Sequence, residues 1–487
     1  MKRVLTSASL LSPANSKGDI NLKEKKSLKN KFTYGIGAIG LDLSYGMFYS
    51  YLAKYMTDVL KLNKIFLLLI TPVARIWDGI NDPMMGTIVD NTKTKMGKYR
   101  PWILIGSCCN AVVLVLLFTN PGLQIGGIPL HIYTAILYVF WGMTNTMADI
   151  PYWSMVPSFT SDPAERNIIA TIARAFSGLG QGIISILTPV VLPLLSVTFD
   201  PNTNEKVWDA RGFSIWALIC GACLIGFSSL SVATTKEKHI VPPTAEKFTF
   251  KKMFRIAKGN DQLLVFMLFA MLSNAGWYMI SGVGAYYFDV VIGDIEAQSL
   301  FNTIGAVGSV LGLLVVPLMT KFTTRRRTYQ FSLTMAIVGF TGTMAFASFF
   351  GEPKLMAMNI SYLVASIGVA SMFVSQTVFL ADIVDYGHVK QGFRSESITF
   401  SMKGFLQKMA YTIQTIILFS GLQISGYDET LHAANSQGVK TSISVMMLGV
   451  PIILFVISLL IFTFKFKLHG KYMEEITAKI NEMKEGV

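Results

Sequence analysis

Long apolar runs recur along the chain, and short polar stretches separate them. Each run is long enough to cross a membrane as a helix, which takes about 20 residues. The runs are predicted to be helices because lipid offers no hydrogen-bonding partner to the backbone, and because they lack the alternation typical of outer-membrane β-strands. They cover twelve ranges: 33–59, 65–89, 101–120, 130–157, 167–192, 212–233, 263–291, 297–319, 329–351, 355–383, 396–425 and 441–464.

This pattern predicts an all-α membrane protein with twelve transmembrane helices in two six-helix halves. The longest polar connection, residues 234–262, contains Pro242-Pro243 and separates the sixth run from the seventh. Two halves that surround a midplane site are typical of secondary transporters. The expected parts are an N-terminal tail, an N-terminal bundle, a central loop, a C-terminal bundle and a C-terminal tail, at residues 1–31, 32–233, 234–262, 263–466 and 467–487.

Composition and charge support a multi-pass membrane protein. Hydrophobic residues make up 52% of the chain, charged residues only 15%, and the mean hydropathy is +0.49, which excludes an ordinary soluble domain. Of the 42 Lys and Arg residues, 31 lie in the two tails and in the loops on the same side as the tails. Because basic loops are retained in the cytoplasm, both termini are predicted to be cytoplasmic. The net charge of +13 is then expected to face anionic membrane lipids rather than a nucleic acid.

Two motifs of soluble proteins occur in apolar runs, where their usual chemistry is not expected. Cys220-x-x-Cys223 has no second pair of ligands for zinc. Gly35-x-Gly37-x-x-Gly40 matches the dinucleotide fingerprint, but no strand precedes it, so close helix packing is the better interpretation. The chain has no P-loop, Ser-His-Asp spacing or nucleophile elbow. We therefore expect neither an enzyme nor a resident cofactor.

Ionisable residues inside the apolar runs are the strongest functional signal. Each costs about 2.5 to 3.5 kcal/mol at the bilayer centre on insertion scales, so several in one bundle need a reason. In the second run, steps of three and four residues place Arg75, Asp78 and Asp82 on one helical face. Purely structural ion pairs are the alternative, and they would require almost complete mutual neutralisation. The other polar residues in the runs are Asp42, Asn81, Thr146, Asp149, Arg174, Lys403 and Lys408.

Their chemistry suggests two sites. Sodium prefers several oxygen ligands, whereas a proton needs only one carboxylate, so the type of ion stays open. A sugar needs buried donors and acceptors for its hydroxyls, and often an aromatic face. The cation candidates are Asp78, Asn81, Asp82 and Thr146, and the sugar candidates are Asp42, Asp149, Trp153 and Arg174.

At these residues the chain resembles the melibiose carrier family, the glycoside-pentoside-hexuronide:cation symporters, which are a branch of the major facilitator superfamily. The most specific stretch is ARIWDGINDPMMG at 74–86, followed by GKYRPW at 97–102. Further matches are WGMT at 141–144 and DIPYWS at 149–154, with DYG at 385–387 and ESI at 396–398 in the second half. The resemblance therefore covers nearly the whole chain.

The resemblance implies a major facilitator-type fold and assigns roles by position. It implies a Na⁺ site at Asp78, Asn81, Asp82 and Thr146, modulating charges at Arg75 and Lys408, and a sugar site at Asp42, Asp149, Trp153 and Arg174. Two positions depart from the family pattern, since Leu41 stands in place of a lysine and Asn145 in place of a tyrosine. The identity of the glycoside is therefore left open.

The expected function is symport of a small glycoside, such as melibiose or a related galactoside, with Na⁺, or with H⁺ or Li⁺, by alternating access in a bacterial inner membrane. A proton-coupled pentoside or glucuronide carrier is the alternative, and a lysolipid carrier or a non-transporting sugar sensor is less favoured. The expected partners are the glycoside, the co-transported cation and membrane lipids, with a functional monomer. The basic loops 90–100 and 321–327 either gate the cytoplasmic side through charge pairs or are solvated segments whose charge only sets the topology.

Overall fold

The computed structural model describes residues 31–159, 163–199, 206–237, 258–349, 354–392 and 396–485. Throughout these ranges the regular elements are helices, accompanied by two isolated single-residue bridges. The predicted all-α class is therefore confirmed. The predicted N-terminal tail, except its last residue, and most of the predicted central loop lie outside the described residues.

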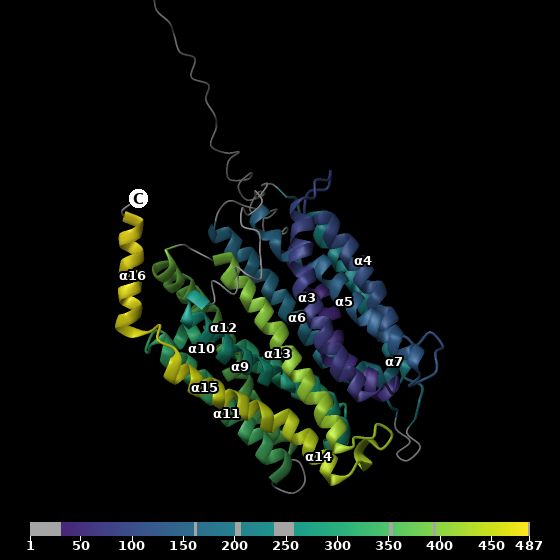
Figure 1. Ribbon diagram of the computed structural model, residues 1–487. Coiled ribbons are helices and arrows are strands. Elements are labelled where there is room, and N and C mark those ends of the chain that lie inside the picture. Colours follow the sequence, from purple (N-terminus) through teal and green to yellow (C-terminus); the bar gives the residue numbers. More distant parts are fainter. Residues whose placement is uncertain are drawn as a thin grey trace, which may run out of the picture.

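The helices follow the predicted runs closely (Figure 1). The first run is a helix over residues 31–46 that continues into η1 (Met47–Tyr51), α2 (Leu52–Lys54) and η2 (Tyr55–Val59). The N-terminal half then contains α3 (Lys64–Asp90), α4 (Arg100–Leu117), α5 (Ile128–Ser154), α6 (Pro163–Leu195) and α7 (Ala210–Thr234). The C-terminal half contains α9 (Asp261–Tyr286) with η4 (Tyr287–Ile292), α10 (Ala297–Met319), α11 (Arg325–Met344) with η5 (Ala345–Phe349), α12 (Leu355–Gln391), α13 (Glu396–Ser425), and α14 (Gln437–Ser444) with η7 (Val445–Gly449) and α15 (Val450–Lys465).

Eight helical segments in the described parts of the chain are long and apolar enough to cross a membrane. This number confirms a multi-pass membrane protein. Residues 31–59, α3, α5 and α13 fall outside that group of eight, and these elements carry nearly all the polar residues predicted for the two sites. That all twelve segments span the membrane stays a prediction.

Several helix boundaries have clear local causes. The side chains of Asn63, Asp209 and Asn260 accept backbone N–H hydrogen bonds at the starts of α3, α7 and α9, which satisfies donors that have no partner within the helix. At the C-terminal ends of helices, Gly293 after η4 and Gly392 after α12 have φ of +76°, a conformation that glycine adopts without a steric penalty.

The two halves pack internally and then against each other. In the N-terminal half, α4 packs against α5 and α7, and in the C-terminal half α12 packs against α10 and α11. The halves meet where α3 packs against α13 and α6 against α10. Figure 1 shows the purple and blue helices of the first half beside the green and yellow helices of the second. This interface contains the predicted cation residues.

The glycines of the first helix confirm the packing interpretation of their motif. A Cβ atom at Gly37 would lie 2.8 Å from Ser231 of α7, and one at Gly40 would lie 3.0 Å from Leu224 of the same helix. At Gly35 the nearest atom, from Phe176 of α6, would be 3.0 Å away. The small residues therefore permit the backbones to approach closely.

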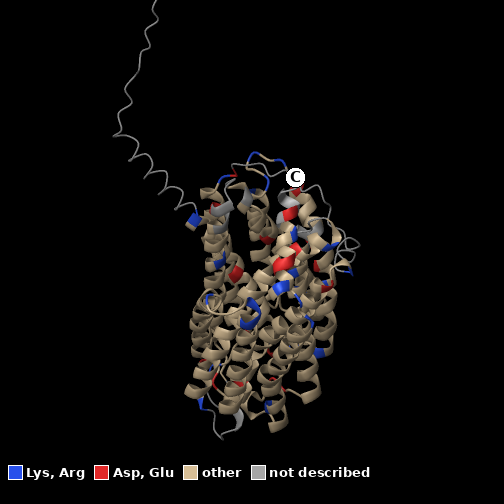
Figure 2. Ribbon diagram, turned by 90° about the vertical axis from the view of Figure 1, so that its left-hand side faces the viewer, with Lys and Arg blue, Asp and Glu red and all other residues tan. Residues whose placement is uncertain are grey.

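The two ends of the helical bundle are named here by the elements that lie at them. The start of the first helix and α16 (Gly470–Glu485) lie at one end, which we call the terminal end, and the opposite end is called the distal end (Figures 1 and 2). The sequence predicted a tail from residue 467, whereas most of that segment is helical. Ile476 and Ile480 of α16 are buried, and the helix packs against α12.

Candidate functional site

Arg75 and Asp78 form a buried ion pair on α3. Their side chains approach to 2.7 Å, as expected for charges three residues apart on a helix. The Arg75 guanidinium also donates to the hydroxyls of Tyr49 and Tyr138, at 2.9 and 3.3 Å, and lies 5.1 Å from the Tyr411 ring centroid. These contacts compensate for the removal of a cation from water. The Asp78 charge is therefore balanced by a residue of its own helix.

Asp82 joins three helices at the interface between the halves. The Thr146 hydroxyl of α5 donates to one carboxylate oxygen at 3.0 Å, and the Lys408 ammonium of α13 contacts the other. The Asp82 side chain is 34% exposed and the Lys408 side chain 20% exposed, so this pair is hydrated more than the Arg75 pair. Asp82 therefore links the N-terminal half directly to the C-terminal half.

The remaining predicted cation residues flank this contact. Asn81 is buried, and its amide nitrogen has no hydrogen-bonding partner among the described residues. The Asp78 carboxylate lies against α5, where a Cβ atom at Gly142 would come within 2.5 Å of it. The structure thus brings Asp82 into direct contact with Thr146 and places Asp78 and Asn81 on the adjoining turn of α3.

The predicted sugar residues form a second cluster. The Trp153 indole nitrogen donates to an Asp149 carboxylate oxygen at 2.9 Å, because α5 stays helical through Pro151 and the four-residue step is preserved. The Arg174 guanidinium of α6 covers the Trp153 ring at 3.7 Å from its centroid. Arg174 is exposed, and Asp149 and Trp153 are half-buried. This cluster presents a carboxylate, a cation and an aromatic ring to solvent.

Asp42 completes the cluster from the first helix. Its carboxylate interacts with the side chains of Ser177 and Gln181 on α6, and with the charges of Asp149 and Arg174. Asp149 in turn interacts electrostatically with Asp82 and Lys408. The two predicted sites are therefore neighbours within one electrostatic network, although their assigned roles stay predictions.

Two predicted features lie elsewhere. Lys403 donates to the Thr377 hydroxyl at 2.8 Å, a contact between α13 and α12 within the C-terminal half. The Cys220-x-x-Cys223 pair consists of free cysteines on α7. The described residues include no group of three His, Cys, Asp or Glu side chains arranged to hold a metal ion.

A group of charged residues at the distal end was missed by sequence reasoning. The Lys54 ammonium lies 2.7 Å from Asp58 and 2.6 Å from Asp289, and His432 lies 3.1 Å from Asp289. Lys54, Asp58 and Asp289 fall inside predicted apolar runs. Scoring every ionisable residue in those runs would therefore have found three of the four residues.

The predicted gating loops form charge pairs within their own halves. Lys98 pairs with Asp90 at 2.7 Å, and Arg325 pairs with Asp382 at 2.9 Å. The Glu237 carboxylate, just after α7, accepts backbone N–H bonds from residues 98, 99 and 100 at 2.8 to 3.1 Å. It thereby caps α4 and anchors the first loop. Gating between the halves by these loops stays a prediction.

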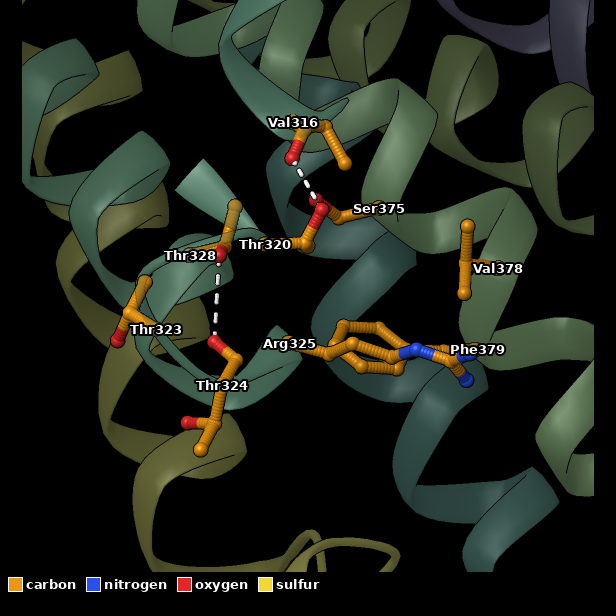
Figure 3. Close-up of a pocket in the computed structure, with 9 residues that line it drawn as sticks. All are labelled: Val316, Thr320, Thr323, Thr324, Arg325, Thr328, Ser375, Val378 and Phe379. Atoms are coloured by element: carbon orange, nitrogen blue, oxygen red, sulfur yellow. Dashed lines mark hydrogen bonds between the residues drawn. The ribbon is translucent and has the colours of Figure 1, made fainter. Parts of the chain in front are cut away.

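A cavity of about 490 Å³ opens between α10, α11 and α12 (Figure 3). Three of its hydroxyls donate to backbone carbonyls, Thr320 to Val316, Thr328 to Thr324 and Ser375 to Ser371. Arg325 is held by its ion pair with Asp382. The cavity lining includes none of the predicted site residues, so we do not assign the transported substrate to it. It is lined by Val316, Thr320, Thr323, Thr324, Arg325, Thr328, Ser375, Val378 and Phe379.

Comparison with protein families and curated proteins gives consistent matches. The family model described as MFS/sugar transport protein matches residues 33–470. The uncharacterized symporter YjmB of Bacillus subtilis is 28% identical, with 96% of this chain and 98% of that protein covered. The lactose permease of Lactobacillus delbrueckii is 25% identical, covering 94% of this chain and 73% of the permease. The isoprimeverose transporter of Lactiplantibacillus pentosus is 27% identical, covering 92% and 90%.

Solved structures support the same fold. A bacterial homolog of the human lysosomal transporter Spinster, in an inward-facing and unoccupied conformation, superposes with a TM-score of 0.64 at 13% identity, covering 90% of this chain and 96% of that one. The xylose transporter XylE from E. coli gives a TM-score of 0.59 at 12% identity, with 90% and 99% covered. At these identities the likeness concerns the fold alone.

Proposed function

The chain belongs to the MFS/sugar transport protein family, and from that premise we propose that it is a symporter that couples inward Na⁺ movement to the uptake of a small glycoside. We expect the monomer to be the transport unit. Lactose permeases and an isoprimeverose transporter among the relatives support a glycoside as substrate. Bacterial relatives, one of them called an inner membrane symporter, support the bacterial inner membrane as the location.

The position of Asp82 is the observation that carries the proposal. This carboxylate touches Thr146 of one half and Lys408 of the other. A cation that binds Asp82 must compete with or displace the Lys408 ammonium, which changes a contact between the halves. Ion binding is thereby linked to the relative movement of the halves, as alternating access requires.

The oxygen ligands around Asp82 favour sodium over a proton. Thr146 contributes a hydroxyl oxygen beside the carboxylate, and Asn81 contributes a buried amide on the same helix. Sodium, a hard cation, binds such mixed oxygen ligands. A proton would need only Asp82 itself, and it remains the alternative ion.

The second cluster supplies the chemistry that a sugar needs. Asp149 and Asp42 accept hydrogen bonds from sugar hydroxyls, Arg174 donates them, and Trp153 offers an aromatic face to C–H groups. Arg174 covers the Trp153 ring in this conformation. Sugar binding against that face therefore requires the guanidinium to move aside, where it can donate to a hydroxyl.

Coupling follows from the electrostatic link between the clusters. Asp149 experiences the charges of Asp82 and Lys408, so a cation bound at Asp82 alters the field at the sugar cluster. If the cation tightens sugar binding by a given factor, the sugar must tighten cation binding by the same factor. The expected coupling free energy is about 1 to 3 kcal/mol.

Charge distribution supports a cytoplasmic terminal end. The tails and the loops at that end carry most of the basic residues, and basic loops are retained in the cytoplasm. The inter-half ion pair between Lys54 and Asp289 lies at the distal end, which is then extracellular. This arrangement corresponds to a closed outer face.

A second candidate substrate is a hexuronide. The exposed Arg174 guanidinium could pair with a substrate carboxylate in the bidentate geometry that arginine favours. A proton-coupled pentoside carrier is the other alternative within the family. The charged lining of the cluster disfavours a lysolipid, and a sugar sensor that does not transport would lack gradient-driven accumulation.

The test is uptake into membrane vesicles that contain the overproduced chain. Radiolabelled melibiose, lactose, an isoprimeverose-type xyloside and a glucuronide are compared under imposed Na⁺ or proton gradients. We expect one galactoside or xyloside to accumulate under the Na⁺ gradient, and Asp149→Asn to abolish that accumulation. Accumulation of the glucuronide would support the hexuronide alternative. Failure of all four sugars under both gradients would contradict the proposal.

A further inference from the structure

The distal end holds a buried charge cluster that joins the two halves. Lys54 ends α2 of the first half, and its side chain is only 4% exposed. Its ammonium lies between Asp58 of its own helix, at 2.7 Å, and Asp289 of the second half, at 2.6 Å. His432, in the turn after α13, hydrogen bonds to Asp289 at 3.1 Å. We call these four residues the distal cluster.

Further hydrogen bonds across the same end surround the cluster. The Tyr427 hydroxyl of the second half donates to Asp58 at 2.9 Å. The hydroxyls of Thr57 and Tyr286 share a hydrogen bond of 2.8 Å. The Lys64 ammonium donates to the Tyr427 carbonyl at 2.6 Å. Separation of the halves at this end would break all of these bonds together with the ion pair.

The local backbone is irregular at matching positions of the two halves. The first membrane segment of each half ends in a π-helical turn, Tyr55–Val59 in one and Tyr287–Ile292 in the other. Such turns are rare and often mark functional sites. His432 has φ of +39°, a left-handed conformation that is strained for a residue with a side chain. Strain of this kind persists where the surrounding contacts impose it.

The charge balance of the cluster depends on His432. Lys54 supplies one positive charge, while Asp58 and Asp289 supply two negative charges. A neutral His432 leaves a net charge of minus one in a buried place, whereas a protonated His432 brings the net charge to zero. These three residues exert the largest electrostatic effects on His432, and the nearby charges of Lys64 and Glu429 pair with each other. Protonation therefore stabilises the assembled cluster and not the separated halves.

We propose that the distal cluster is a proton-sensitive latch: it holds the outer face closed when His432 is protonated and releases more readily when His432 is neutral. The latch rests on alternating access in the proposed function, but not on the identity of the sugar or of the coupling cation. Its ligand is the proton, bound at a site separate from the Asp82 and Trp153 clusters.

The direction of the histidine shift agrees with this charge balance. The hydrogen bond to Asp289 raises the pKa of His432 above its ordinary value, although burial opposes the rise. When the outer face opens and the partners separate, the pKa returns towards the ordinary value. The latch is therefore at full strength below that ordinary value and is lost as pH rises through the raised one. Alkaline external pH should favour the outward-open state.

The test measures the outer distance directly by double electron–electron resonance. Spin labels replace Gln124 and Glu296, two exposed residues in distal turns of opposite halves, in a chain whose four native cysteines are serine. The labelled protein is reconstituted without sugar, and distances are recorded at pH 6 and pH 8. We expect a longer-distance population that is about tenfold larger at pH 8, the ratio expected for loss of one charge-assisted hydrogen bond.

Variants separate the latch from general effects of pH. His432→Gln should show the longer distances at both pH values, and Lys54→Met should populate them even at pH 6. His131→Gln is the matched control, because His131 lies at the same end but bonds only within the first half, to Asn63 and Gly127.

A pH-independent distance in the unsubstituted chain would overturn the proposal. So would a His432→Gln variant that kept the pH response, or a Lys54→Met variant that stayed closed. Transport of the sugar is not part of this readout, so failure here leaves the proposed function standing.

Discussion

Replacement of Asp82 by asparagine should uncouple the sugar site from sodium without destroying it. The substitution keeps the shape of the side chain and its acceptor for the Thr146 hydroxyl, but it removes the negative charge. Asp82 contacts Thr146 and Lys408 and no member of the sugar cluster. The sugar should therefore still bind in sodium-free buffer, and because the lost charge acts on Asp149, its affinity should change by no more than the coupling free energy of about 1 to 3 kcal/mol.

The loss of sodium affinity follows from the geometry. Two unit charges about 4 Å apart interact by about 4 kcal/mol at an effective dielectric constant near 20. The Asp82 side chain is 34% exposed, and solvent screening reduces this figure to about 2 kcal/mol. Sodium should therefore bind about 30-fold more weakly to Asp82→Asn. The stimulation of sugar binding by sodium should disappear at ordinary salt concentrations.

The assay measures sugar affinity by isothermal titration calorimetry of the purified protein, in sodium chloride or in choline chloride at equal ionic strength. Asp90→Asn is the matched control, because Asp90 ends the same helix, pairs with Lys98 and undergoes the same change of charge. The control should keep its sodium stimulation. The reasoning is refuted if Asp82→Asn responds to sodium like the unsubstituted chain, or if Asp90→Asn loses its response equally.

Four further predictions use the same structure. Asp149→Asn should weaken sugar binding about 10- to 100-fold, because a charge-assisted acceptor is lost, while sodium binding measured by isotope exchange changes little. Gly37→Leu should lower the melting temperature by several degrees, since a Cβ there already meets atoms at 2.8 Å, whereas Gly86→Ala, with open space around it, should not. Glu237→Gln should destabilise the protein by about 1 to 2 kcal/mol in thermal unfolding, through weaker capping of α4. Initial uptake by His432→Gln should lose the pH dependence of the unsubstituted chain between pH 6 and 8, because the raised pKa of His432 no longer contributes.

The length and continuity of the apolar runs were sufficient to predict the helices, because a membrane-spanning helix must be apolar over about 20 residues. Eleven of the predicted runs match helical segments within a few residues at each end, while α12 continues well past the predicted end at residue 383 to Gln391. That extension is polar and lies at the terminal end, so hydropathy could not reveal it. The helix α16 was missed for a similar reason, since its apolar side is narrow and is buried by α12.

The candidate site was predicted in part. The contact of Asp82 with Thr146 and that of Asp149 with Trp153 follow from residue chemistry and helical spacing. The aromatic surroundings of Arg75 depend on residues from three other helices, which spacing along one chain cannot bring together. Membership in a family of transporters confirms that the chain is not an enzyme. The distal cluster was not predicted, because Lys54 and Asp289 lie towards the ends of their apolar runs and not near the bilayer centre.

Sugar-dependent cation movement tests the central claim most directly. Proteoliposomes are prepared with equal sodium and pH on both sides, and the transported glycoside is added outside. Symport predicts that the sugar, moving down its own gradient, carries sodium into the vesicles in a fixed ratio, and that Asp82→Asn abolishes the sodium influx. Sugar entry without any movement of sodium or protons would contradict the account and would identify a uniporter instead.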